Sequence, residues 1–189
     1  MVIMNNNSTD IFNELINELV FLTELQTTAD TRVINRLLVR SIFSLLDAFS
    51  SSLKLLSLNT YEYEKTIFSE KDLRFLREGE YKIENNVEVW KLYLPGIRES
   101  IKKSLKLYAK SGNTKSPLLK SAPLPTEFKE ALKLRTHVTH PKCLDDLIIT
   151  SSEMRSVFYV LEWLKKLFLW ARDQEINNIK NIRTNIDTT

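Results

Sequence analysis

The sequence predicts an all-α fold, an antiparallel bundle of four to five main helices with a small β-hairpin as an appendage. Apolar residues recur at three- and four-residue intervals over most of the chain, which is the spacing of a helix that buries one side. Only 3 glycines and 5 prolines occur among 189 residues, few for a loop-rich or all-β protein. We therefore expect a single helical domain that spans residues 1–189 and has a substantial core.

Two amphipathic helices are predicted in the first third of the chain. The first covers residues 9–25, with Ser8 or Asp10 as its N-cap. The second follows a break at residues 26–30 and ends near residue 58. Its apolar residues form one arc, which contains Ile34, Leu37, Leu38, Ile42, Leu45, Phe49, Leu53 and Leu56.

Four residues stand in line on the opposite side of this second helix: Arg36, Arg40, Phe43 and Asp47. One interpretation is a solvated face that carries a salt bridge, because residues three or four apart are neighbours on a helix. The other interpretation is that this face borders a site, where Asp47 orients Arg135. The sequence leaves both open.

The middle of the chain contains a short helix, the hairpin and another long helix. Ser69 is a plausible N-cap for a short helix over residues 70–77. Apolar and polar residues then alternate around a pair of asparagines, which predicts a β-hairpin insertion at about residues 80–94. Pro95 opens the next helix, which ends near Lys110.

The helix after Pro95 carries the densest basic stripe in the sequence. Its members are Arg98, Lys102, Lys106 and Lys110, with Lys103 nearby and Glu99 as the one acid. A charged stripe on a helix is most often its solvated face. If the protein binds RNA, however, this stripe is where contacts to the phosphate backbone are expected.

The last third is predicted to hold a loop and two more helices. Residues 111–126 contain Gly112 and three prolines and are expected to form a loop. A helix starts near Pro125 and ends at His140. Thr150 and Glu153 fit a capping box for a final helix that runs to about residue 179, followed by a frayed tail at about residues 181–189. Trp163 and Trp170 share a second flank of that helix, which indicates either more core or a dimer contact.

Composition narrows the functional classes only moderately. The net charge of +3 permits a nucleic-acid partner without arguing for one. A single cysteine, Cys143, excludes an intrachain disulfide and fits a reducing compartment. The first ten residues have no basic segment or cleavable apolar segment, and charged residues interrupt the apolar runs, so we expect a cytoplasmic protein with no membrane association. The sequence lacks a phosphate-binding loop, a nucleophile elbow, a zinc-protease motif and a dinucleotide fingerprint.

Both histidines of the chain fall in one window, which runs from Arg135 to Pro141 and is followed by Lys142. Arg is suited to gripping a phosphate and His exchanges protons near neutral pH. Pro141 biases His140 away from helical geometry, so the helix is expected to stop there and leave His140 accessible. This favours His140 over His137 as the reactive residue, with His137 and Lys142 as supporting neighbours.

Three interpretations of the window remain open on the residues alone. The histidines are ordinary surface or capping residues at a helix C-terminus, where positive charge is favourable. Alternatively His137, His140 and Cys143 bind zinc with Asp145 or Asp146, although Pro141 breaks the helix between them and no clear fourth ligand is present. The third is phosphoryl chemistry on RNA without a metal or other cofactor, with His140 moving the proton and Arg135 stabilising charge.

The window resembles the Arg-x(4–6)-His motif of the HEPN superfamily. The segment from Lys133 to Lys142 is similar to the R-N-x-x-x-H-P-K form of that motif, and the strong part of the match covers residues 132–167. The resemblance implies a small helical protein that forms a homodimer and brings two motifs together in a cleft. It further implies a metal-independent ribonuclease of a toxin–antitoxin or defence system, with Arg135 and His140 as catalytic residues and an antitoxin or accessory protein as a possible partner. A non-catalytic interaction module of the same fold is the alternative.

Overall fold

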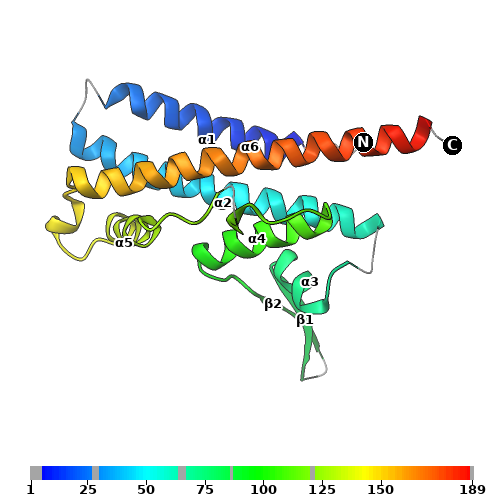
Figure 1. Cartoon of the computed structure of the whole chain (residues 1–189). Helices are drawn as coiled ribbons and strands as arrows, with labels where there is room; N and C mark the ends of the chain where they lie inside the picture. The colour runs from blue at the N-terminus through cyan, green and yellow to red at the C-terminus, as the bar shows by residue number, and fades with distance from the viewer. Residues whose placement is uncertain (1–5, 27–29, 64–66, 86, 120–121, 188–189) are drawn as a thin grey trace. The chain divides into compact units, whose positions relative to one another are not determined.

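The computed structural model describes residues 6–26, 30–63, 67–85, 87–119 and 122–187, and it confirms the predicted fold class. The chain is 73% helical and has one small antiparallel hairpin (Figure 1). The elements described are α1 (Asn6–Leu25), α2 (Thr31–Tyr63), α3 (Glu70–Leu76), β1 (Gly79–Glu84), β2 (Val87–Leu92), α4 (Ile97–Ser111), the 3-10 helix η1 (Pro117–Leu119), α5 (Phe128–Thr139), the 3-10 helix η2 (Leu144–Leu147) and α6 (Ser151–Asp187).

The chain divides into two compact units, which are described separately below. Unit 1 consists of residues 1–9 and 47–116, and unit 2 consists of residues 10–46 and 117–189. The long helix α2 contributes its first half to unit 2 and its second half to unit 1. The expectation of a single domain stays a prediction.

Unit 1 is built from the second half of α2 together with α3, the hairpin and α4. A hydrophobic cluster joins these elements, with Phe68, Leu73, Phe75, Leu76 and Leu107 buried at its centre. Three buried serines cross-link α2 to α4, because the Ser50 hydroxyl lies 3.1 Å from that of Ser100 and 2.9 Å from that of Ser104. Burying these hydroxyls is tolerable because they hydrogen-bond to one another.

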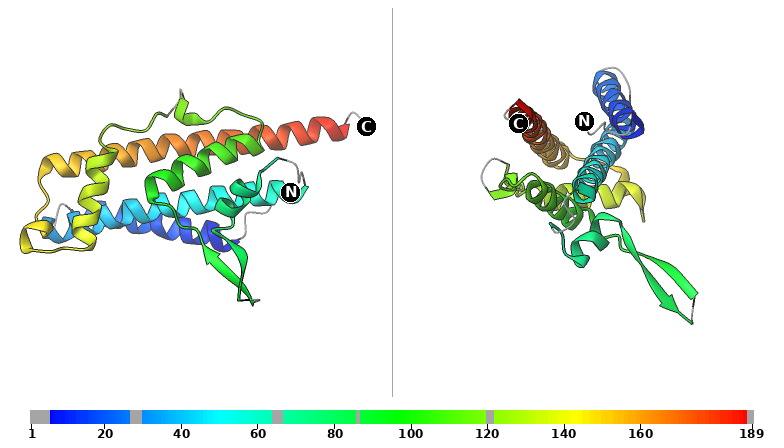
Figure 2. Two further views of the ribbon diagram at one scale, coloured as in Figure 1. Left: turned by 90° about the horizontal axis from the view of Figure 1, so that it is seen from below. Right: turned by 90° about the vertical axis from the view of Figure 1, so that its right-hand side faces the viewer.

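The short helix α3 and the hairpin form as the local sequence predicts. The Ser69 hydroxyl accepts a hydrogen bond from the backbone of Asp72, and the Asp72 carboxylate accepts one from the backbone of Ser69, which completes a capping box. The hairpin pairs Gly79 with Leu92 at its base and Glu84 with Val87 at its tip. Its tip extends away from α3 as a two-stranded ribbon (Figure 2).

Unit 2 packs α5 against α6 through aromatic side chains. The Phe128 ring lies edge-on to Trp163 at 5.6 Å and to Phe43 of α2 at 6.3 Å, measured between ring centroids. Trp163 is buried, and its indole N–H donates a 3.0 Å hydrogen bond to the Ala122 carbonyl. Trp163 therefore belongs to the core rather than to a dimer contact.

Several element boundaries differ from the sequence expectation. Helix α2 continues to Tyr63 and α6 continues to Asp187, because neither run meets a glycine or proline that would end it. Residues 188–189 of the expected tail lie outside the described part of the chain. Helix α5 begins at Phe128, three residues later than expected, since the backbone forms a turn first. The predicted loop at residues 111–126 contains the 3-10 helix η1.

Helix α2 also bears on the expectation of no membrane association. From the sequence, charged residues are expected to interrupt every apolar run that could span a membrane. Residues 31–62 are nevertheless long and apolar enough to cross a membrane by length and composition. In the structure 56% of the most apolar stretch is buried inside the protein, and the core helix of a soluble protein passes the same test. The feature is weak evidence, and the absence of membrane association stays a prediction.

Candidate functional site at the end of α5

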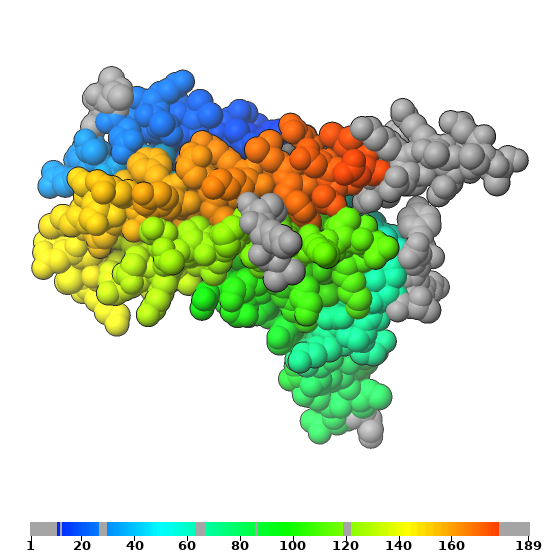
Figure 3. Space-filling view, viewed as in Figure 1, coloured from blue at the N-terminus to red at the C-terminus, as the bar shows by residue number. Residues whose placement is uncertain are grey.

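The candidate site lies where α5 ends, and His140 is the C-cap that follows the last helical residue, Thr139. The backbone N–H of His140 still donates a 2.9 Å hydrogen bond to the carbonyl of Thr136, but its φ of −130° and ψ of 63° have left the helical region. Pro141 explains this geometry, since it disfavours helical angles in the residue before it. The His140 side chain is exposed, and the segment after α5, yellow in Figure 3, is at the surface of unit 2.

Arg135 lies one turn before the end of α5 and is half-buried. Its backbone carbonyl accepts a 2.6 Å hydrogen bond from the Thr139 hydroxyl, which reinforces the last turn. Among the described residues of unit 2, no carboxylate forms an ion pair with the Arg135 guanidinium. A partly buried guanidinium without an acidic partner is well suited to an external anion such as phosphate.

Two arginines of α2 reach the same end of unit 2. Arg40 Nη2 donates a 2.6 Å hydrogen bond to the Val138 carbonyl, and Arg36 Nη1 lies 3.4 Å from the Leu147 carbonyl. Carbonyls at a helix C-terminus carry partial negative charge, so a guanidinium there is favourable. The face that carries Arg36 and Arg40 is thus not merely a solvated one, and Phe43 in the same line is buried in the core.

The remaining predicted residues of the window hold the connection after α5. The Asp146 carboxylate accepts hydrogen bonds from the backbone N–H groups of Lys142 at 2.7 Å and Cys143 at 3.3 Å. These bonds, that from Lys142 first, together with the positive charge of His137, hold the pKa of Asp146 below its usual range. Lys142 therefore contributes its backbone to the loop while its side chain is exposed.

The zinc interpretation requires His137, His140 and Cys143 to come together with an aspartate. Among the residues that the structure describes, no group of three or more His, Cys, Asp or Glu side chains is arranged to hold a metal ion. Asp146 instead accepts the backbone hydrogen bonds of the loop, and Cys143 is exposed.

The basic stripe on α4 is partly neutralised within unit 1. Lys102 lies 3.7 Å from Glu99, and Lys110 lies 3.8 Å from Asp72. Lys103 is also 3.7 Å from Asp72, and its ammonium stands over the Phe75 ring at 4.6 Å. The stripe therefore serves the packing of α4 on α3 as well as facing solvent. Its role in RNA binding, including that of Arg98 and Lys106, stays a prediction.

Asp47 belongs to unit 1 and Arg135 to unit 2, so the suggested orientation of Arg135 by Asp47 stays a prediction. One of the two sequence interpretations lets the face of Arg36 and Arg40 border the site of Arg135, but it does not identify the carbonyls that these arginines contact. Their three- and four-residue spacing with Phe43 indicated a second face, but the partner of that face lies about a hundred residues further along the chain.

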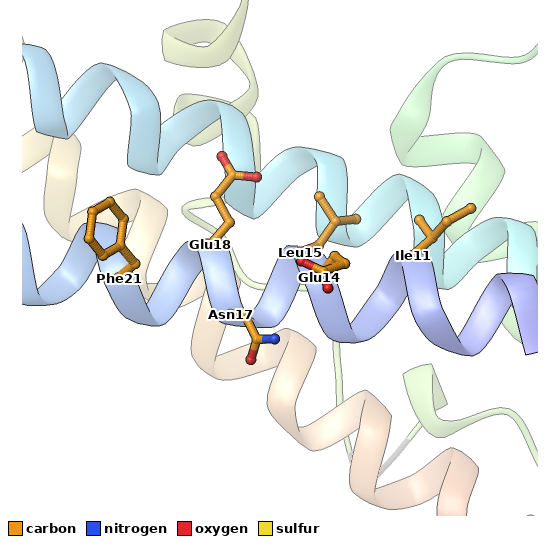
Figure 4. Close-up of a pocket in the computed structure, with 6 residues that line it drawn as sticks. All are labelled: Ile11, Glu14, Leu15, Asn17, Glu18 and Phe21. Carbon is orange, nitrogen blue, oxygen red and sulfur yellow. The ribbon is translucent and has the colours of Figure 1, made fainter.

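A concave region lies on α1 in unit 2. It has a volume of about 610 Å³ and is lined by side chains of that one helix, as Figure 4 shows. Glu18 points toward α2 and accepts a 2.7 Å hydrogen bond from the Ser41 hydroxyl. Because Glu18 already serves the packing of α1 on α2, this region has fewer chemical groups to offer than the end of α5.

No family model matches the chain, and no curated protein or solved structure matches it either. The resemblance to the HEPN motif stays a prediction.

Proposed function

We propose that the protein is a HEPN-like, metal-independent endoribonuclease that cleaves single-stranded RNA at the end of α5. The observation that carries this proposal is the pairing of two groups on one helix end. Arg135 has no acidic partner among the described residues of unit 2, and the exposed His140 lies just after the last helical turn. Arginine and histidine are suited to phosphoryl transfer without a metal, because one stabilises charge and the other moves protons.

In the proposed reaction the 2′-hydroxyl of a ribose attacks the adjacent phosphorus. The new O2′–P bond forms as the P–O5′ bond breaks, which leaves a 2′,3′-cyclic phosphate and a 5′-hydroxyl end. His140 accepts the proton of the 2′-hydroxyl, and Arg135 stabilises the negative charge that develops on the phosphate oxygens. Arg36 and Arg40 are occupied by backbone carbonyls and add positive charge to the surroundings.

The reaction also needs an acid to protonate the departing 5′-oxygen. A single histidine cannot be base and acid in the same step, so we propose that a second copy of the chain supplies the other histidine. This is the reason to expect a homodimer, in a cytoplasmic toxin–antitoxin or defence setting with an antitoxin or accessory partner, as the HEPN motif implies. A monomeric active enzyme in light scattering at micromolar concentration would contradict the shared site.

Cleavage of RNA in the presence of EDTA tests the proposal directly. The wild-type protein is expected to convert a labelled single-stranded RNA into fragments with 2′,3′-cyclic phosphate ends. Arg135→Ala and His140→Ala should each reduce the rate by at least a hundredfold, since general acid–base groups contribute about 10²–10⁴. Lys129→Ala is the matched control, because Lys129 is an exposed cation of the same helix. Equal rates for all four proteins would reject the proposal.

A specific feature favours a second candidate, a non-catalytic interaction module. Helix α1 exposes several large apolar side chains, namely Ile11, Ile16, Val20 and Phe21. Exposed apolar side chains gathered on one helix are typical of a surface that another protein covers. The interaction module is the better description if the protein cleaves no RNA but forms a stable complex with another protein, and if the double variant Ile11→Asp, Phe21→Asp abolishes that complex.

A further inference from the structure

A pocket in unit 1 carries chemistry that the proposed cleavage site does not use. It lies between α3 and the hairpin and has a volume of about 810 Å³. Basic and aromatic side chains line it together with two acidic residues, Glu70 and Glu80. This volume falls within the range of small-molecule sites, about 300–1,000 Å³. The pocket is described wholly within unit 1, so its interpretation does not depend on where unit 2 lies.

The basic wall of the pocket comes from α3. Lys71, Arg74 and Arg77 follow one another at three-residue steps, which places them along one side of the helix and its C-cap. Lys71 and Arg77 are exposed, and neither has an acidic partner among the residues described. Two unpaired cations beside one pocket are a match for phosphate oxygens.

Arg74 is held differently and offers one further donor. Its Nη1 lies 3.1 Å from Glu80, and its guanidinium stands over the Tyr93 ring at 4.8 Å. Its Nε is buried and has no hydrogen-bond acceptor among the described residues. A buried donor without an acceptor is costly. Glu80 is already neutralised, since Lys82 also lies 3.1 Å from it.

The aromatic wall of the pocket comes from the hairpin. Tyr81 and Trp90 are directly opposite each other across the strands, with ring centroids 4.8 Å apart, and both are exposed. Gly79 allows this arrangement, because a Cβ at that position would stand 2.6 Å from the Trp90 ring. Exposed aromatic rings next to unpaired cations are the combination by which proteins bind single-stranded nucleic acid, with bases stacked on the rings.

We infer that this pocket is a nucleotide-binding site, in which Trp90 or Tyr81 stacks on a base while Lys71 and Arg77 bind its phosphate. The nucleotide belongs to a single-stranded RNA, so the inference deepens the proposed function and rests on it for the identity of the strand. A free mononucleotide presents the same base and phosphate and is the other source of this chemistry.

The test measures RNA binding in a protein that cannot cleave. Full-length protein carrying Arg135→Ala and His140→Ala is titrated with a fluorescein-labelled RNA octamer in EDTA, and anisotropy is recorded at several salt concentrations. Adding Lys71→Ala and Arg77→Ala should weaken binding at least tenfold. It should also reduce the magnitude of the slope of log affinity against log salt concentration by about 1.4, the value for two phosphate contacts on a single strand. A double variant of two exposed cations on α6, Arg155→Ala and Lys166→Ala, removes the same charge and should change neither quantity.

Stacking is tested separately with Trp90→Leu in the same parent protein. This variant should weaken binding about tenfold while it leaves the salt dependence unchanged, because it removes a ring and no charge. A mere folding defect would not separate the two readouts, affinity and salt dependence, in this way.

Competition by adenosine monophosphate for the labelled octamer is the second experiment. Competition by the mononucleotide at the concentration of the octamer assigns the site to free nucleotides, whereas competition only at far higher concentration assigns it to RNA.

Three results would overturn the inference. These are unchanged octamer affinity in both pocket variants, loss of affinity in the charge variant alone, and equally tight binding of a poly-aspartate peptide of the same length, which would indicate an acidic protein partner. The outcome of the binding test does not depend on whether the wild-type protein cleaves RNA. Wild-type protein that cleaves no RNA but shows the expected binding pattern leaves the pocket standing and removes the nuclease proposal. Cleavage by the wild-type protein together with unchanged binding in both pocket variants leaves the nuclease proposal standing and removes the pocket inference.

Discussion

Arg40 Nη2 donates a 2.6 Å hydrogen bond to the carbonyl oxygen of Val138, and this bond joins α2 to the last turn of α5. The two residues are 98 positions apart in the chain, so the bond is a tertiary contact and not part of either helix. It satisfies a carbonyl that the end of the helix leaves without an intrahelical partner. The geometry of the segment that carries His140 therefore depends on a side chain from another helix.

Replacing Arg40 should loosen the end of α5. Arg40→Ala is expected to cost about 1–2 kcal/mol of unfolding free energy, because it removes a charge-assisted hydrogen bond and a favourable charge at a helix C-terminus. Arg36→Ala is the comparison, and its effect should be smaller because the Arg36 bond to Leu147 is longer, at 3.4 Å. Urea unfolding followed by circular dichroism measures both. Equal midpoints for wild type and Arg40→Ala would show that the bond does not contribute to stability.

Gly79 should tolerate no side chain. A Cβ there would lie 2.6 Å from both the Lys91 carbonyl oxygen and the Trp90 ring, and the carbonyl is backbone that cannot turn aside. We expect Gly79→Ala to destabilise the protein by about 1–3 kcal/mol and to displace Trp90 from the pocket. Thermal unfolding and tryptophan emission measure the two effects.

Gly96 provides the matched control for this substitution. A Cβ at Gly96 meets nothing within 4 Å, and its φ of −58° suits any residue. Gly96→Ala should therefore change stability by less than about 1 kcal/mol, because the restriction of the unfolded chain by alanine opposes the preference for glycine over alanine at the N-cap of α4. If both variants unfold at the same temperature, the close approach at Gly79 is not what limits the hairpin.

The features that the sequence predicts well are those that depend on neighbours along the chain. Ser69 and Thr150 were readable as helix caps because each bonds a residue three positions later, and Pro141 predicted the end of α5. Phe43 was placed on a polar face because its burial depends on Phe128, which comes 85 positions later in the chain. The two carbonyls that Arg36 and Arg40 contact were hidden for the same reason.

The pocket of unit 1 was missed for a related reason. Lys71, Arg74 and Arg77 show a regular spacing in the sequence, but on its own this spacing predicts only a short helix. Tyr81 and Trp90 become neighbours only once the hairpin register pairs them. A search for basic residues next to strand positions that pair two aromatics would have found this combination.

The ion pair between Lys54 and Glu78 should respond unequally to loss of its two members. Lys54 is buried with 7% of its side chain exposed, whereas 42% of the Glu78 side chain is exposed, and the charged atoms are 2.8 Å apart. Removing Glu78 leaves a buried ammonium without a partner, but removing Lys54 leaves a carboxylate that water can reach. We therefore expect Glu78→Gln to cost about 2–3 kcal/mol and Lys54→Met to cost less than 1 kcal/mol.

The Lys54→Met variant keeps the long apolar stem beside the Phe75 ring, over which the ammonium stands at 4.9 Å. Denaturant titration of both single variants and of the double variant measures the coupling between the two side chains. A larger loss for Lys54→Met than for Glu78→Gln would mean that cation–aromatic contact, rather than charge burial, governs this pair.

The loop after α5 should lose its order in acid, because Asp146 holds it only as a carboxylate. Hydrogen bonds from the backbone of Lys142, then that of Cys143, and the charge of His137 lower the pKa of Asp146 in the folded protein. A carboxyl whose folded-state pKa lies below its unfolded value, about 3.9, stabilises the fold above that value. This stabilisation falls away as the pH drops below about 3.9 and through the folded-state pKa.

Amide resonances of Lys142 and Cys143, followed between pH 6 and pH 2, measure this transition. In the wild type they should shift with a midpoint below pH 3.9, and Asp146→Ala should abolish the shift at both amides. Asp145→Ala is the matched control, because Asp145 is adjacent and exposed. Its backbone carbonyl accepts a hydrogen bond from the N–H of Ile148, and this bond does not involve the Asp145 side chain. If the amide resonances of Asp146→Ala shift with pH as those of the wild type do, another carboxylate holds the loop next to His140.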